Sequence, residues 1–139
     1  MFEILLAEDN PGDVLLFREA LNTQGVLCNL AVASDGRKAI SLLESDSYRP
    51  DLIVLDVNLP KDNGDAVLRH IRNQEWLKTV PVIMLTSSAS PTDQASALAH
   101  GATLYLQKSS DLNELLDFGK TVQSVLSGAD LWGAKPQNV

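Results

Sequence analysis

The sequence predicts an α/β fold in which a sheet of five parallel strands carries helices on both faces. Short apolar runs of strand length alternate five times with longer stretches in which apolar residues recur at helical spacing. The run at residues 52–55 is apolar throughout, as in a central parallel strand that is covered on both sides. Strict alternation of this kind favours right-handed crossovers. A chain of 139 residues is the usual size of one domain.

Each expected element is bounded by turn-forming or polar residues. We expect strands at residues 2–7, 27–32, 52–55, 81–85 and 103–106. The expected helices run from about Asp13 to near Gly25, through Ala39, Leu42 and Leu43, through Ala66, Val67, Ile71 and Trp76, through Ala95, Leu98 and Ala99 to near Gly101, and from about Asp111 to Leu126. Ser90 followed by Pro91 is typical of a helix N-cap and a first-turn proline.

Composition excludes several classes of function. Eighteen acidic residues against eleven basic ones give a net charge of −7, which opposes nonspecific binding to nucleic acid or anionic lipid. No apolar run approaches the roughly 20 residues that a bilayer span needs, and the first residues lack the pattern of a secretory signal. The single cysteine, Cys28, fits a reducing compartment. We therefore expect a cytoplasmic protein that binds neither nucleic acid nor membrane.

Chemically capable side chains follow four of the predicted strands. In open parallel sheets, functional groups gather at the carboxyl ends of the strands, so these side chains share one edge. They are Glu8 and Asp9 after the first strand, Asp56 after the third, Thr86 after the fourth and Lys108 just beyond the fifth.

A cation is needed to bring such carboxylates together, because they otherwise repel one another. Hard oxygen ligands without a nearby His or Cys suit Mg²⁺. The hydroxyl of Thr86 and the ammonium of Lys108 would bind a phosphoryl group. This combination predicts a site for phosphoryl transfer to a carboxylate.

With these residues the chain resembles a response-regulator receiver domain. The resemblance covers about residues 2–126. It rests on Glu8-Asp9, on Asp56 within Leu-Asp-Val-Asn-Leu-Pro, and on Gly64, Thr86, Tyr105 and Lys108. It implies a doubly wound, flavodoxin-like (βα)5 fold with strand order 2-1-3-4-5. It also implies a receiver domain at residues 1–127 and a C-terminal tail at residues 128–139.

The resemblance also implies a role for each site residue. Asp56 would accept a phosphoryl group from the phosphohistidine of a sensor histidine kinase. Asp9, Asp56 and the main-chain carbonyl of Asn58 would ligate Mg²⁺, with Glu8 acting largely through water. Lys108 and Thr86 would bind the phosphoryl oxygens, and Thr86 and Tyr105 would act as the switch. Such a protein catalyses its own phosphorylation and dephosphorylation, and is a signalling protein of a two-component phosphorelay, not an enzyme with a separate substrate.

A narrower resemblance is to the stand-alone receivers that work with phytochromes. It rests on the opening Glu-Asp-Asn-Pro-Gly-Asp, on Asn-Leu-Pro after the acceptor, and on Trp132 in the tail. It implies a phytochrome-type histidine kinase as phosphodonor. It also implies a homodimer formed through the fourth helix, fifth strand and fifth helix, the face that would carry the output.

One residue departs from the receiver pattern. Ser109 follows Lys108, where the family usually has a proline, often after a cis peptide. A cis bond before a residue other than proline costs about 2.5–4 kcal/mol, so the sequence leaves the geometry of this peptide open. We hypothesise that Lys108 still reaches Asp56.

Three other functions fit the sequence less well. A hydrolase or phosphotransferase that forms an aspartyl-phosphate usually has a second acid where this chain has Asn58, and it also needs a cap domain. A pseudo-receiver interaction module would not need the acids, Thr86 and Lys108. In a flavodoxin-like cofactor binder, the acids after the first strand would repel a flavin phosphate. Taken singly, Glu8-Asp9, Asp56 and Thr86 could be ordinary turn, strand-end and cap residues, and Tyr105 could be a half-buried strand residue. His70 and His100 are expected to be solvated helix residues.

Overall fold

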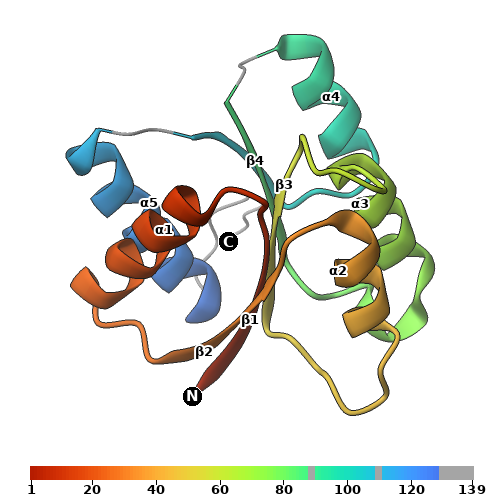
Figure 1. Ribbon diagram of the computed structural model, residues 1–139, viewed down its shortest axis with the longest axis horizontal. Helices are drawn as coiled ribbons and strands as arrows, with labels where there is room; N and C mark the ends of the chain where they lie inside the picture. Colours follow the sequence, from red (N-terminus) through yellow and green to blue (C-terminus); the bar gives the residue numbers. More distant parts are fainter. Residues whose placement is uncertain (88–89, 109–110, 129–139) are drawn as a thin grey trace.

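The computed structural model describes residues 1–87, 90–108 and 111–128. Figure 1 shows a central sheet with a helical layer on each side. The strands are β1 (Phe2–Ala7), β2 (Cys28–Ala33), β3 (Leu52–Asp56), β4 (Val82–Thr86) and β5 (Leu104–Gln107). The helices are α1 (Pro11–Thr23), α2 (Gly36–Leu43), α3 (Gly64–Asn73), α4 (Pro91–Ala99) and α5 (Leu112–Leu126), with a short 3-10 helix η1 (Glu75–Leu77).

All five strands run parallel in the order β2-β1-β3-β4-β5, which confirms the predicted fold and strand order. Side chains of successive strand residues point to opposite faces, so the sheet separates two cores. One core lies under α1 and α5 and contains Ile4, Leu6 and Val54. The other lies under α2, α3 and α4 and contains Leu5 and Ile53. Every residue of β3 is buried, as a strand covered on both faces requires.

Polar side chains fix where the helices begin. The side chain of Asn10 accepts hydrogen bonds from the amides of Gly12 and Asp13, so α1 begins at Pro11, two residues before the predicted start. Ser90 caps α4 and Pro91 occupies its first turn, as predicted. None of the helices in the described part of the chain combines the length and apolar character that a bilayer span needs.

Trp76 does not belong to the buried face of the third helix, so this prediction is wrong. Helix α3 ends at Asn73 and the chain then turns through η1. This turn directs Leu77 into the core, while Trp76 remains 37% exposed. The guanidinium of Arg49 lies over its ring, 4.2 Å from the centroid.

Helix α4 forms where Ala95, Leu98 and Ala99 predicted it, but these three residues do not face the core. Ala95, Leu98 and Ala99 are exposed, and of the described residues 91–99 only Ala97 is buried. The apolar residues of this helix recur at helical spacing, but the helix places one small residue against the core. The periodicity of Ala95, Leu98 and Ala99 therefore does not identify the buried face.

The guanidinium of Arg72 holds the carboxyl end of α4. Its Nε donates to the carbonyl of Gly101, at 2.8 Å, and its Nη1 donates to the carbonyls of Leu77, Lys78 and Val80 at 3.0, 3.3 and 2.9 Å. Gly101 has a φ of +102° and packs against the Arg72 side chain. Burial lowers the pKa of Arg72 from its usual value, yet a guanidinium remains charged in proteins. Arg72 thus joins the end of α3 to the turns before β4 and after α4.

Candidate functional site

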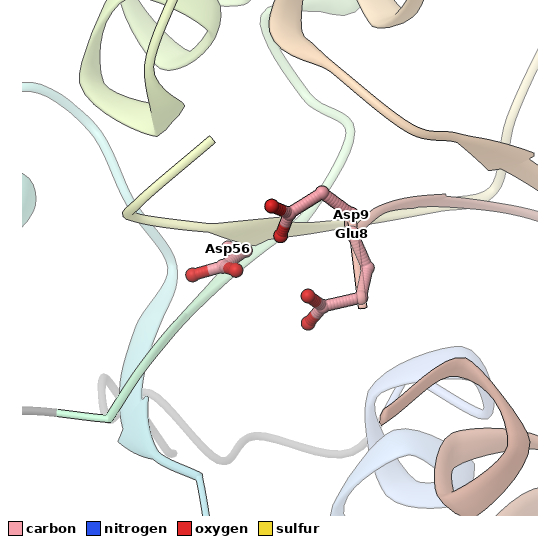
Figure 2. A group of neighbouring side chains, drawn as sticks. All are labelled: Glu8, Asp9 and Asp56. Carbon is pink, nitrogen blue, oxygen red and sulfur yellow. The ribbon is translucent and has the colours of Figure 1, made fainter. Parts of the chain in front are cut away.

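The acidic pair and the central acid meet at the carboxyl ends of β1 and β3. Figure 2 shows the carboxylates of Glu8, Asp9 and Asp56 grouped there. Each contributes one oxygen, and these oxygens all lie within 4.8 Å of one another. Glu8 and Asp56 are 3% and 4% exposed, whereas Asp9 is exposed. The main chain holds this edge together, because the amide of Glu8 donates to the carbonyl of Ala33.

Lys108 places its ammonium group among these carboxylates. The Nζ atom lies 2.8 Å from Oε1 of Glu8 and 3.0 Å from Oδ2 of Asp56. The main-chain amide of Lys108 donates to the carbonyl of Thr86, which fixes the start of this loop. In this structure Lys108 therefore reaches Asp56, whereas the peptide that joins it to Ser109 lies outside the described residues.

Asp13 is a member of the site to which sequence reasoning gave no role. It lies in the first turn of α1, and its Oδ2 is 3.1 Å from Nζ of Lys108. An available signal was its position three residues after the Asn10 cap, because the first turn of a helix that follows a strand lies at the carboxyl edge of the sheet. Asp13 adds a third carboxylate to the contacts of Lys108.

Burial and charge oppose each other in this network. Burial raises the pKa of Glu8 to about 7, although the ammonium of Lys108 and the amide of Asn10 favour its charged form. For Lys108, burial alone would lower the pKa, but hydrogen bonds to Glu8, Asp56 and Asp13 outweigh it and raise the pKa above its usual value. Lys108 therefore stays charged, whereas the pKa of Glu8 lies close to neutral pH.

The donor set fits a hard divalent cation. Glu8, Asp9 and Asp56 offer only oxygen atoms, which Mg²⁺ prefers. The backbone of Asn58 adjoins them, since its amide donates to Oδ1 of Asp56 at 3.0 Å. Asp9 and Asn58 also line a cleft of about 640 Å³ that provides room beside the carboxylates. These residues could hold the ion beside the acid that Lys108 contacts.

Thr86 and Tyr105 lie on the other side of Asp56. Thr86 ends β4 and is 2% exposed, next to Asp56 at the end of β3. Tyr105 in β5 is half-buried and lines the same cleft as Asn58. Its hydroxyl is shielded from solvent and has no hydrogen-bond partner among the described residues. A buried hydroxyl without a partner costs about 1–3 kcal/mol, so a conformation that satisfies it would be favoured.

The two histidines are not the solvated residues that the sequence predicted. Nδ1 of His100 lies 3.1 Å from Oδ1 of Asp65, which places a ring from the end of α4 against the first turn of α3. Nε2 of His70 is buried and has no hydrogen-bond partner in the described part of the chain. Both rings are thus at least partly shielded, and that of His100 lies where the end of α4 meets α3.

Residues 4–118 match the sequence profile of the response regulator receiver domain. This chain belongs to the receiver-domain family. One relative is the response regulator Rcp1 of Synechocystis sp., 36% identical over 126 residues, which cover 87% of this chain and 86% of Rcp1. Another is the transcriptional regulatory protein CpxR of Klebsiella pneumoniae, 40% identical over 116 residues, or 84% of this chain and 47% of CpxR. The chain thus spans about half the length of CpxR.

Solved structures agree with the fold. The phosphorylated cyanobacterial phytochrome response regulator RcpA has a TM-score of 0.82 at 32% identity, with 91% of this chain and 94% of RcpA covered. The Mn²⁺-bound form of Rcp1 has a TM-score of 0.81 at 31% identity, with both chains fully covered. The Mg²⁺-bound receiver domain of sensor histidine kinase PA1611 from Pseudomonas aeruginosa has a TM-score of 0.71 at 33% identity, over 86% of this chain and 95% of that domain.

These matches confirm both resemblances, to receiver domains in general and to the phytochrome-associated regulators in particular. The chain is a receiver-domain signalling protein of the two-component type. Manganese and magnesium in two of the similar structures occupy receiver domains of the same fold.

Proposed function

We propose that Asp56 accepts a phosphoryl group from a sensor histidine kinase of the phytochrome type, in the cytoplasm. The observation that carries this proposal is the position of Asp56, which is buried, contacts Lys108 and is grouped with the acidic pair Glu8-Asp9. A carboxylate in this setting has one fixed cation in contact and carboxylate ligands for a second cation beside it. The similarity to Rcp1 and RcpA supports a phytochrome-type donor.

The transfer exchanges one bond for another. A carboxylate oxygen of Asp56 bonds to phosphorus while the bond between phosphorus and the donor imidazole nitrogen breaks, and the imidazole then takes up a proton. The ammonium of Lys108 and the hydroxyl of Thr86 bind phosphoryl oxygens. Mg²⁺, held by Asp9, Asp56 and the carbonyl of Asn58 with Glu8 through water, would offset the added negative charge when bound.

The signal leaves the domain by altered binding. Thr86 moves toward the phosphoryl group and Tyr105 turns inward. The Tyr105 hydroxyl supports such a change, because it is buried and has no hydrogen-bond partner among the described residues. The surface formed by α4, β5 and α5 changes with them and forms a homodimer. Exposed apolar residues on α4 support this choice of surface. We assign residues 1–127 to the receiver domain and residues 128–139 to a tail, most of which lies outside the described residues.

The test is phosphorylation by acetyl phosphate in the presence of Mg²⁺, followed by intact-mass spectrometry. We expect one added phosphoryl group that hydroxylamine removes, as it does from an acyl phosphate. The addition should be absent in Asp56→Asn and present in Asp117→Asn, which changes an exposed acid of α5. Sedimentation before and after phosphorylation tests the homodimer. Equal phosphorylation of wild type and Asp56→Asn would overturn the proposal, and no phosphorylation of either would favour a pseudo-receiver.

A further inference from the structure

The loop that follows the acceptor strand is held in an unusual backbone conformation. This acceptor loop, residues 57–63, joins β3 to α3. Lys61 and Asp62 have φ values of 45° and 53°, in the left-handed region that residues other than glycine seldom adopt. Such a conformation persists only where the surrounding structure enforces it. The source of that enforcement lies in a different part of the chain.

Gly36, the first residue of α2, contacts the main chain of the acceptor loop. Its amide donates to the carbonyl of Pro60 at 3.1 Å. A Cβ atom at this position would overlap the carbonyl oxygen of Asp62 and would lie 2.6 Å from that of Lys61. Both obstacles are backbone atoms, which cannot rotate away as the end of a side chain can. The missing side chain of Gly36 therefore gives the loop the space that it occupies.

Side chains add weaker contacts between the same two segments. Asp35 is buried and caps α2, and its Oδ2 lies 3.8 Å from Nζ of Lys61. Nε of Arg37 lies 3.9 Å from Oδ2 of Asp62. Ion pairs this long, each with at least one exposed partner, contribute little free energy. The main-chain contact at Gly36 is thus the principal constraint.

The constraint reaches the phosphoryl site through few residues. Pro60, which accepts from Gly36, is two residues from Asn58, and the side chain between them, Leu59, is anchored in the core. The amide of Asn58 in turn donates to Oδ1 of Asp56. At its other end the loop closes by a hydrogen bond from the amide of Gly64 to the carbonyl of Val57. The path from the Gly36 contact at Pro60 to the hydrogen bond between Asn58 and Asp56 is thus only two residues long.

We propose that Gly36 is a positioning residue for the Mg²⁺ site. It holds the acceptor loop from the far side, so that Asn58 stays beside Asp56. The β2-α2 connection, which contributes no ligand, then sets the metal affinity. This inference rests on the proposed function, in which the Asn58 carbonyl is a ligand.

The test compares two glycine variants by isothermal titration calorimetry with Mg²⁺. Gly36→Ala should weaken Mg²⁺ binding by roughly 10- to 100-fold, the usual effect of changing groups that orient metal ligands. The matched control is Gly119→Ala in α5, where an added Cβ would lie 2.6 Å from the carbonyl oxygen of Ala20, remote from the site. The control should lose stability but keep the wild-type Mg²⁺ affinity. Equal affinity in Gly36→Ala and wild type, or equal weakening in both variants, would overturn the inference.

Two further measurements separate positioning from general damage. In the metal-free protein, hydrogen exchange at the Asn58 amide should be faster in Gly36→Ala than in wild type or Gly119→Ala. Adding Asp62→Gly should restore part of the Mg²⁺ affinity, because a glycine at this position lets the obstructing peptide rotate. Should Gly36→Ala fail to fold, the double variant is compared with Asp62→Gly alone and is expected to bind Mg²⁺ more weakly.

If the proposed function is wrong, the result differs from that of a wrong inference about Gly36. Wild-type protein that binds no Mg²⁺ would contradict the metal site itself. The exchange rate of Asn58 would then still test whether Gly36 positions the loop, and an unchanged rate in Gly36→Ala would refute it.

Discussion

Helices α1 and α4, which lie on opposite faces of the sheet, are held in different ways. On one side, the rings of Phe17 in α1 and Phe118 in α5 meet with their centroids 5.2 Å apart, and Val122 is fully buried. On the other side, α4 inserts a single buried alanine and is held at its end by a polar contact between His100 and Asp65. No residue of the described strand β5, beside it, is fully buried.

The residues of the site are divided between the neighbourhoods of these two helices. Glu8 follows β1, and Asp13 lies in the first turn of α1, the helix whose Phe17 packs against Phe118 of α5. Thr86 and Tyr105 come from the strands next to α4, and Lys108 follows the second of these strands. The groups proposed to switch thus adjoin a helix in which, of the described residues 91–99, Ala97 alone is buried. Low local stability is what an element that moves requires.

The largest expected effect tests the packed side. Phe17→Ala removes a buried ring from between α1 and α5 and should lower the free energy of unfolding by about 3–5 kcal/mol, as is usual for a buried phenylalanine. Urea denaturation measures it. Leu15→Ala, at a position of the same helix that is 61% exposed, is the control and should cost far less. Similar losses in the two variants would show that α1 and α5 are not packed as described.

The next effect concerns the charge on the packed side. The pKa of Glu8 is about 7 in the folded chain against 4.5 for a free glutamate carboxyl, so folding takes up a proton between these pH values. The stability of wild type relative to Glu8→Gln should be greatest below pH 4.5. It should fall by up to about 3 kcal/mol as the pH rises to 7, since one pKa unit corresponds to about 1.4 kcal/mol. Urea denaturation with a chelator present measures this, and a difference independent of pH would contradict it.

A smaller effect tests the polar contact of α4. His100→Ala removes the ring that approaches Asp65 and should cost at most about 1 kcal/mol of global stability, as for other partly exposed polar pairs. Hydrogen exchange in α4 should nevertheless accelerate, while exchange in α1 stays unchanged. Lys78→Ala, which removes a surface ion pair with Glu75, is the control. Unchanged exchange in α4 would mean that His100 does not hold this helix.

The smallest effect is expected at Leu98. This side chain is 45% exposed on α4, so Leu98→Ala should change the stability of the unphosphorylated protein by less than about 0.5 kcal/mol. Thermal unfolding at several protein concentrations measures it and detects any association. A loss comparable with that of Phe17→Ala would show that α4 packs as tightly as α1.

Much of the fold and site could be predicted because both depend on where strands end. Short apolar runs identified the strands, and parallel strands bring their carboxyl ends to one edge, so Glu8, Asp9 and Asp56 converge as expected. The roles of these residues, and of Thr86, Tyr105, Asn58 and Lys108, stay predictions until phosphorylation is measured.

The remaining features depend on distances that no sequence pattern encodes. Asp13 contacts Lys108 only because of how α1 leaves the sheet edge. Gly36 matters because a distant loop passes against it. Periodicity wrongly extended the third helix to Trp76. It found α4 but could not identify its buried residue, because periodicity shows which residues could share a face but not which face meets the core.

Arg72 fixes the carboxyl end of α4 relative to the rest of the domain. Its guanidinium donates to the carbonyl of Gly101, just past the helix, and to three carbonyls in the turns before β4. Because carbonyl groups do not titrate, these hydrogen bonds keep their strength at any pH at which the chain is folded. We therefore expect a displacement near Thr86 to move the first turn of α4 further than its carboxyl end. That first turn follows Thr86 in the chain, beside the proposed phosphoryl site.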